Sequence, residues 1–355
     1  TGAAAAAHGG FTSVIMMGNT RPPMDDPDVI REALDRGRQT GIRVHSCGNV
    51  TRGMLGRELT DFAALRQAGA VLLTDDGLPV RDDGVMRRAC EEAAKAGMVL
   101  SLHEEDPQYV TQAGVNNGEV AWELGFECGA DRRAEITMVE RDIRLARETG
   151  AQITVQHISA RESVELIREA RAEGVLIHAE GTPHHFSLTE DAVRTAGTNA
   201  RINPPLREEA DRQAVIEGLA DGTIDMIATD HAPHTAAEKA RDFAHAPSGI
   251  VGLETALSLV QRELVTPGYL TWPRAVERLT AAYAVYGLPG GRVETGAAAD
   301  LVLYDPSGSW TVSEQTLHSK SKNTPFLHET LPGVVKMTVC GGRIAWKDAP
   351  VSGEN

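Results

Sequence analysis

Residues 152–179 read QITVQHISARESVELIREARAEGVLIHA, and this stretch decides the predicted fold. Its two ends, 152–156 and 175–179, are short apolar runs rich in β-branched residues, which is typical of buried strands. Between them, residues 161–172 place apolar side chains three and four positions apart, as an amphipathic helix does. A strand, a helix and a second strand in so short a stretch indicate a repeating unit of a parallel sheet covered by helices.

The same alternation extends over most of the chain. Further amphipathic helices are predicted at 82–96 and 135–149. Strands are predicted near 13–17, 42–46, 70–74, 98–102, 152–156, 175–179 and 224–229. A closed (β/α)8 barrel has eight strands, and here seven follow an alanine-rich run that reads as the end of a helix. We therefore expect an α/β fold of the TIM-like (β/α)8 type whose strand one lies upstream of Thr1.

The sequence changes character at about residue 291. The segments ADLVLYDP, SWTV and VVKMTVCGGRIAWKD are short β-type runs separated by Gly, Pro and Ser. We expect residues 1–290 to form the catalytic barrel domain with strands two to eight. Residues 291–355 are expected to form the C-terminal part of a small β-sandwich-like annex. Its exposed strand edges would pair with a segment preceding Thr1.

Composition limits the class of protein. The 355 residues are 41% hydrophobic, which supplies an ample core, and carry a formal net charge of -15. Nucleic acid and anionic membranes are therefore disfavoured as partners, because both would be repelled. The four cysteines are scattered without a C-x-x-C pair, and no membrane span or signal peptide is recognisable. We expect a cytoplasmic protein that acts on a small molecule.

Acidic and imidazole side chains follow four of the predicted strands. TDDG supplies Asp76, SLHEED supplies His103, VQHIS supplies His157, and IATDHAPH supplies Asp230. The carboxyl ends of barrel strands share one rim, and this set of groups suits a divalent metal such as zinc. Taken singly, a strand-end histidine is more often a satisfied core or loop residue, and an aspartate before a helix is usually an N-cap. Four in register favour a metal site.

Longer motifs resemble those of one family. They are MMGNTRPPMD, LLTDDGLPV, SLHEED, NNGEVAWELG, VQHISARESVELIREA, GTPHH, ARINPPLR, IATDHAPHTAAEK, APSGIVGLETAL and SKNTPF, in this order. The chain resembles a class I dihydroorotase of the amidohydrolase superfamily over essentially its whole length. NPPLR and ATDHAPH are the specific motifs, because strand-end histidines alone are common to many amidohydrolases.

The resemblance implies the reaction and its cofactor. Dihydroorotases reversibly hydrolyse the cyclic amide of (S)-dihydroorotate to N-carbamoyl-L-aspartate in pyrimidine biosynthesis. The complete enzyme is expected to hold two divalent ions, zinc by ligand type, that share a hydroxide. By resemblance, Asp76 bridges the ions, and His103 and His157 complete the second ion's ligands. Asp230 binds the first ion and moves the proton, and Asp75 is structural.

The resemblance also implies substrate contacts. Asn19 and His234 would bind the substrate carboxylate, Asn203 the ring amides, and the backbone at Pro247 and Gly249 would close over the ring. The alternative for each asparagine is an ordinary turn former. That alternative is stronger at Asn19, because a glycine precedes it where the family has proline.

One expected motif is absent from the sequence. The superfamily's His-x-His on strand one occurs nowhere in these 355 residues, so we expect an N-terminally shortened chain with negligible turnover on its own. A hydantoinase or allantoinase is the first alternative, disfavoured because strand four lacks their metal-bridging lysine. A non-catalytic scaffold that partners aspartate transcarbamoylase is the second. A homodimer also stays open.

Overall fold

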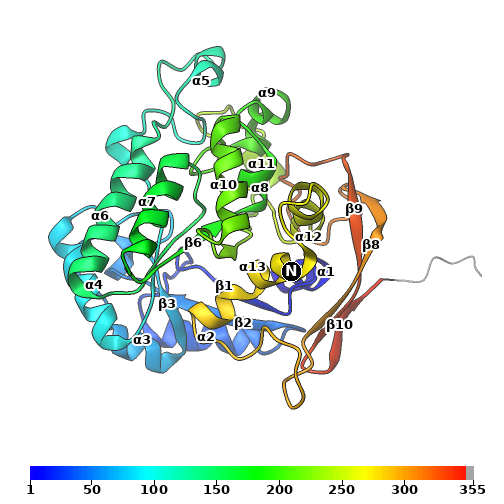
Figure 1. Ribbon diagram of the computed structural model, residues 1–355, viewed down its shortest axis with the longest axis horizontal. Helices are drawn as coiled ribbons and strands as arrows, with labels where there is room; N and C mark the ends of the chain where they lie inside the picture. The colour runs from blue at the N-terminus through cyan, green and yellow to red at the C-terminus, as the bar shows by residue number, and fades with distance from the viewer. Residues whose placement is uncertain (349–355) are drawn as a thin grey trace, which may run out of the picture.

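A helix-covered parallel sheet forms the body of the protein (Figure 1). The computed structural model describes residues 1–348. Seven parallel strands are paired in chain order, β1 to β7. They are β1 Ser13–Met16, β2 Arg43–Gly48, β3 Ala70–Leu73, β4 Leu100–Leu102, β5 Ile153–Val155, β6 Ile177–Gly181 and β7 Met226–Ile227. Within the described residues β7 does not pair with β1, so the sheet curls like a barrel without closing. The predicted strands and fold class are confirmed.

Helices cover the outer face of this sheet. The longer ones are α1 Gly2–His8, α2 Pro27–Gly37, α3 Phe62–Ala68, α4 Asp83–Ala96, α6 Arg133–Thr149, α7 Arg161–Ala172, α10 Glu209–Asp221 and α13 Trp272–Val285. Short helices lie in the connections: α5 Glu119–Glu123, α8 Pro183–Ser187, α9 Ala192–Ala196, α11 Ala236–Lys239 and α12 Ala256–Val260. The helices predicted at 82–96, 135–149 and 161–172 correspond to α4, α6 and α7.

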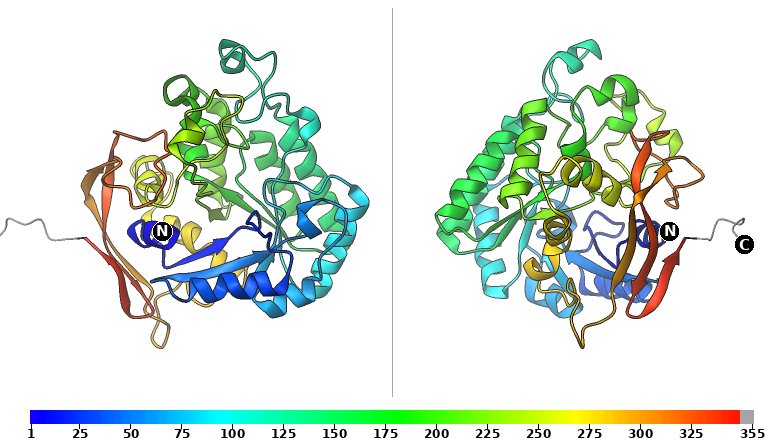
Figure 2. Two further views of the ribbon diagram at one scale, coloured as in Figure 1. Left: turned by 180° about the vertical axis from the view of Figure 1, so that it is seen from behind. Right: turned by 45° about the vertical axis from the view of Figure 1, so that its right-hand side comes forward.

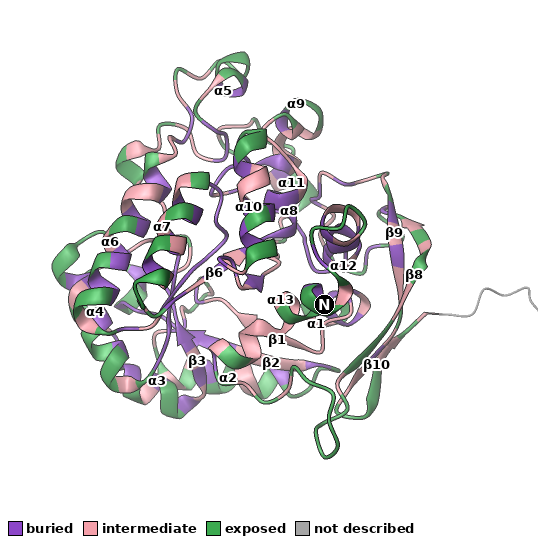
Figure 3. Cartoon of the chain, in the orientation of Figure 1, coloured by how far each residue is buried: buried purple, intermediate pink, exposed green. Residues whose placement is uncertain are grey.

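The boundaries of α4 show how local sequence sets these helices. The Asp82 side chain accepts a hydrogen bond from the Val85 backbone N–H, which caps the first turn. Gly97 ends the helix in the left-handed conformation, with φ of 61°. Val85 and Met86 face the sheet and are buried. Figure 3 shows the same division for most of the outer helices, with buried residues toward the sheet and exposed residues outward.

A second, antiparallel sheet stands beside the barrel (Figure 2). Its strands are β8 Leu301–Thr311, β9 Thr330–Cys340 and β10 Arg343–Lys347, in the order β10, β9, β8. ADLVLYDP and SWTV, expected as separate strands, belong to the single strand β8. Its register against β9 shifts between Asp305 and Ser309, which accommodates Pro306 on an edge strand. The domain boundary predicted at residue 290 lies in the loop before β8 and stays a prediction.

The alanine-rich helix α1 packs between the two sheets. Ala5, Ala6 and Ala7 are buried with Leu253 of the barrel. The Thr338 hydroxyl of β9 donates to the Ala7 carbonyl at 2.7 Å. Small side chains therefore allow the helix backbone to approach β9 closely. No helix in the described residues is long and apolar enough to cross a membrane.

Candidate active site

Three of the predicted metal ligands meet at the carboxyl end of the sheet. Asp76 follows β3, His103 follows β4 and His157 follows β5. His103 Nδ1 lies 2.9 Å from His157 Nε2. Asp76 Oδ1 lies 3.7 Å from His103 Nδ1 and 4.0 Å from His157 Nε2. Ligands about 2.0–2.1 Å from a tetrahedral ion would be about 3.3 Å apart, so these separations bracket what one ion requires.

The two histidines of the cluster are buried, Asp76 is partly exposed, and their charges are coupled. Burial raises the pKa of Asp76, but hydrogen bonding to His157 and the nearby imidazoles outweigh it, and the net pKa is lowered. For His157, burial lowers the pKa, yet Asp76 and Asp230 raise it to about 9. The Nε2 atom of His103 is buried and has no hydrogen-bond partner in the described residues. A site in which two imidazoles and one carboxylate bring their donor atoms together fits a divalent metal.

Asp230 stands near this cluster without belonging to it. It follows β7, and the group whose donor atoms all lie within 4.8 Å of one another contains only Asp76, His103 and His157. Burial raises the pKa of Asp230 to about 6, with His157 and His103 opposing and Asp76 reinforcing the shift. The charges of all three cluster residues therefore affect the pKa of the Asp230 carboxyl group. Its role as a ligand and proton carrier stays a prediction.

The backbone is strained at two of these residues. His157 has a φ of 31° and Asp230 a φ of 43°, although neither is glycine. Side chains with a Cβ rarely adopt this region, and such outliers gather at functional sites. Strain at the ends of both β5 and β7 indicates that the fold holds these side chains in imposed orientations.

The predicted substrate-binding residues form a second group beside the first. The Ser248 hydroxyl donates to Asn203 Oδ1 at 3.2 Å, and His234 Nε2 lies 2.8 Å from the Ser248 carbonyl. The Asn203 amide donates to Glu105 Oε2 at 3.4 Å. The same oxygen lies 3.6 Å from His103 Nε2, so Glu105 connects Asn203 to the cluster. Asn203, His234 and the 247–249 segment are thus brought together next to the three-donor cluster.

Asn19 reaches the site from another direction. A cavity of about 350 Å³ is lined by Asn19, Thr20, Pro23 and Asp76, among others. This volume suits a small ring compound, and both Asn19 and the cluster residue Asp76 line the cavity.

The comparisons with known proteins agree with this geometry. A family model described as dihydro-orotase-like matches residues 1–163. The dihydroorotase of Clostridium acetobutylicum is 46% identical over 98% of this chain and 82% of its own length. That of Lactococcus lactis is 45% identical over the same shares.

The chain belongs to the dihydroorotase family.

Solved structures support the fold assignment. An L-hydantoinase from Arthrobacter aurescens superposes with a TM-score of 0.87 at 24% identity, covering 99% of this chain and 81% of its own. A D-hydantoinase from a Thermus species has a TM-score of 0.81 at 24% identity, covering 99% and 80%. At 24% identity, this similarity shows that the hydantoinases and the dihydroorotase-family chain share a fold. A divalent metal is the cofactor that the family and the cluster together support.

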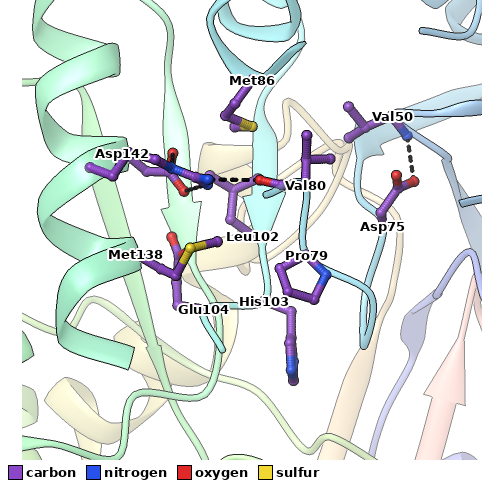
Figure 4. Close-up of a pocket in the computed structure, with 11 residues that line it drawn as sticks. Val50, Asp75, Pro79, Val80, Met86, Leu102, His103, Glu104, Met138 and Asp142 are labelled. Carbon is purple, nitrogen blue, oxygen red and sulfur yellow. Dashed lines mark hydrogen bonds and ion pairs between the residues drawn. The ribbon is translucent and has the colours of Figure 1, made fainter. Parts of the chain in front are cut away.

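Asp75, next to the cluster, has a different surrounding. Its carboxylate accepts hydrogen bonds from the backbone N–H groups of Val50 at 2.9 Å and Thr51 at 3.1 Å, and from the Thr51 hydroxyl. Figure 4 shows the carboxylate turned toward Val50. Its acceptors are occupied in tying β3 to the loop after β2, which agrees with the structural role expected of it in a dihydroorotase.

His231 and His185, two further histidines of the motifs, are held by hydrogen bonds to neighbouring backbone groups. His231 accepts from the Gly252 N–H at 3.2 Å, and burial lowers its pKa to about 4. His185, in α8, lies with Nε2 3.1 Å from the Pro204 carbonyl. It therefore supports the NPPLR turn that carries Asn203.

The sequence analysis did not identify two partly buried residues that contact the site. Glu105 and Ser248 were available in SLHEED and APSG, where their positions beside His103 and Pro247 were the signal. Glu104, two residues after β4, points away from His103 and lies beside Asp142 in α6 (Figure 4). The cavity there is about 10 Å³, room for about one water molecule rather than a substrate.

Proposed function

We propose that the native protein catalyses the reversible hydrolysis of dihydroorotate to N-carbamoyl-aspartate. The observation that supports this proposal is the cluster of Asp76, His103 and His157 in a chain 46% identical to a dihydroorotase. Glu105 contacts both His103 and Asn203, so the predicted amide-binding residue lies next to the cluster. A metal-ligand set and an amide-binding set at one rim are what cyclic-amide hydrolysis requires.

Asp76, His103 and His157 would hold one divalent ion through Oδ1, Nδ1 and Nε2. We propose zinc, because imidazole and carboxylate ligands suit it, and two ions in the complete enzyme. When bound there, such an ion activates water and polarises a carbonyl group. Burial of the two histidines keeps their rings away from bulk solvent.

Asp230 is the proposed catalytic base. Its carboxylate takes a proton from the attacking water as the carbonyl carbon gains an oxygen. When the ring C–N bond breaks, the same carboxyl group gives a proton to the leaving nitrogen. A carboxylate is suited to this exchange if it lies within hydrogen-bond reach of both atoms, and the strained backbone at Asp230 fixes its direction.

The substrate contacts follow from the second group. We propose that Asn203 binds the ring amides and that His234 and Asn19 bind the carboxylate. The backbone at Pro247 and Gly249 would cover the ring. Ser248 holds both Asn203 and His234, so these contacts form one preorganised surface.

Two alternative functions fit the site less well. Hydantoinases are the structural neighbours, but Asp76 stands where a bridging lysine is expected in them. A scaffold that partners aspartate transcarbamoylase would need no intact cluster, whereas the three donors lie together here. A homodimer and a cytoplasmic location complete the proposal.

Substrate competition tests the function. The native full-length protein, loaded with zinc, is assayed for dihydroorotate hydrolysis and for carbamoyl-aspartate cyclisation, with hydantoin, dihydrouracil and allantoin in parallel. We expect turnover of the first pair to exceed the others by orders of magnitude. Preference for hydantoin would support the hydantoinase reading, and no turnover with bound metal would support a scaffold.

A further inference from the structure

The linker between β8 and β9 reaches back to the site through one side chain. Residues 312–329 leave the antiparallel sheet and return to the barrel rim, where Asn323 is buried, with 4% of its surface exposed. Its amide Nδ2 donates to the carbonyls of Ala232 and Gly249, at 3.0 Å each. Its Oδ1 accepts from the His234 N–H at 3.1 Å. One side chain thus joins the loop after β7 to the 247–251 segment.

The two segments also touch directly. The Ala232 N–H donates to the Ile250 carbonyl at 2.9 Å, and the Val251 N–H donates to the Asn323 carbonyl at 3.0 Å. Gly249 has a φ of 145°, and a Cβ there would lie 2.6 Å from the Ala232 Cβ. The segments are therefore closely packed, and Gly249 leaves no room for a side chain between them.

Asparagine is the side chain that this position requires. It supplies two N–H donors and one acceptor in a single rigid plane, which matches the two carbonyls and one N–H that face it. Aspartate has the same shape but no donor, and it would set a negative charge against two carbonyl oxygens. The Gly249 carbonyl has a second donor, the buried ammonium group of Lys239 at 3.1 Å.

We propose that Asn323 is a positioning residue that sets the place of His234 relative to the backbone at Pro247 and Gly249, and thereby the affinity for substrate. The inference rests on the proposed function, which makes these residues the substrate contacts. It assigns to the C-terminal segment a part in the barrel's binding surface. Asn323 acts through its neighbours and contacts no metal ligand directly in the described hydrogen bonds.

The test uses two variants with separable effects. Asn323→Asp keeps the acceptor for the His234 N–H and removes both donors, while Asn323→Ser withdraws all three contacts. Thr324→Val is the matched control, because Thr324 is the next residue and is fully buried. In the part of the chain that the structure describes, its hydroxyl accepts only from the Phe326 N–H, at 3.3 Å. All are made in the native full-length zinc enzyme.

We expect KM for dihydroorotate to rise about 10–100-fold in both Asn323 variants, as for other residues that orient binding groups, with kcat within about threefold. Zinc content should stay at the level of the unaltered enzyme. Hydrogen exchange at the His234 amide should accelerate in Asn323→Ser but not in Asn323→Asp. Thr324→Val should leave KM and this exchange rate unchanged.

An unchanged KM in both variants would overturn the proposal, as would a fall in kcat and zinc content together, which would mark a general loss of structure. Absence of dihydroorotate turnover in the unaltered enzyme would instead overturn the proposed function. The exchange rate of the His234 amide would then still decide whether Asn323 holds the two segments.

Discussion

Aspartate and histidine side chains have different partners at the two ends of the parallel sheet. At the amino end, the Asp225 carboxylate accepts from His178 Nδ1 at 2.7 Å, from Arg171 at 3.0 Å and from the Ala179 N–H at 3.0 Å. Burial raises the pKa of Asp225, and these partners more than reverse it, so the net pKa is lowered. At the carboxyl end, Asp76 faces two histidines, and no arginine or lysine pairs with it in the described residues.

This difference separates stability from function. Barrel-type folds place chemistry at the carboxyl ends of their strands and use the amino ends for stability. At the amino end, the Asp225 carboxylate has its hydrogen-bond partners within the protein. At the carboxyl end, His103 Nε2 has no hydrogen-bond partner in the described residues, and the backbone is strained at His157 and Asp230. Such groups persist because a ligand completes them, at some expense in the stability of the unliganded fold.

The strongest test removes the cluster's carboxylate. In the native full-length enzyme, Asp76→Ala should lower kcat/KM for dihydroorotate by about a thousandfold or more, since metal chemistry contributes several kcal/mol. Zinc content should fall with activity. Retention of the full zinc content in Asp76→Ala would contradict the comparison.

The matching change at the amino end should give the reverse result. Asp225→Ala leaves His178 and Arg171 without their carboxylate, and because these side chains are partly exposed we expect a loss of about 2–3 kcal/mol in the free energy of unfolding. Urea unfolding measures it. Zinc content and kcat/KM of the folded enzyme should not change. Loss of zinc in this variant would show that the two ends are not independent.

The fold and the metal cluster could be predicted from the sequence more completely than the contacts that organise the substrate-binding surface. The strands before Asp76, His103 and His157 are short apolar runs, so periodicity located them and parallel topology brought their ends together. The roles of Asn323 and Glu105 depend on contacts between residues far apart in the chain, which no local pattern encodes. The merging of two predicted strands into β8 was missed for a similar reason, because Pro306 signals a break unless an edge strand accommodates it.

His184 offers the smallest and most specific refinement of the comparison. It lies in α8 near the carboxyl end, with no carboxylate partner among residues 1–348, and burial together with the charge of His157 lowers its pKa to about 3. In the unfolded chain a histidine titrates near pH 6.5, so below that pH the unfolded state binds a proton that the folded state does not. The contribution to stability is complete above pH 6.5 and falls as the pH falls, by about 1.4 kcal/mol at pH 5.5.

Replacing this imidazole should therefore flatten the acid side of the stability curve. Urea unfolding of His184→Asn at pH 7.5 and 5.5 should show a smaller difference between the two pH values than the unaltered protein, by about 1.4 kcal/mol. His245→Asn is the control, because His245 is exposed and paired with Asp242 at 2.7 Å. Equal pH dependence in the His184 variant and the unaltered protein would mean that His184 is protonated in the fold. The carboxyl end would then tolerate charge on its supporting histidines as well as on its ligands, and the contrast between the two ends would narrow to the metal cluster itself.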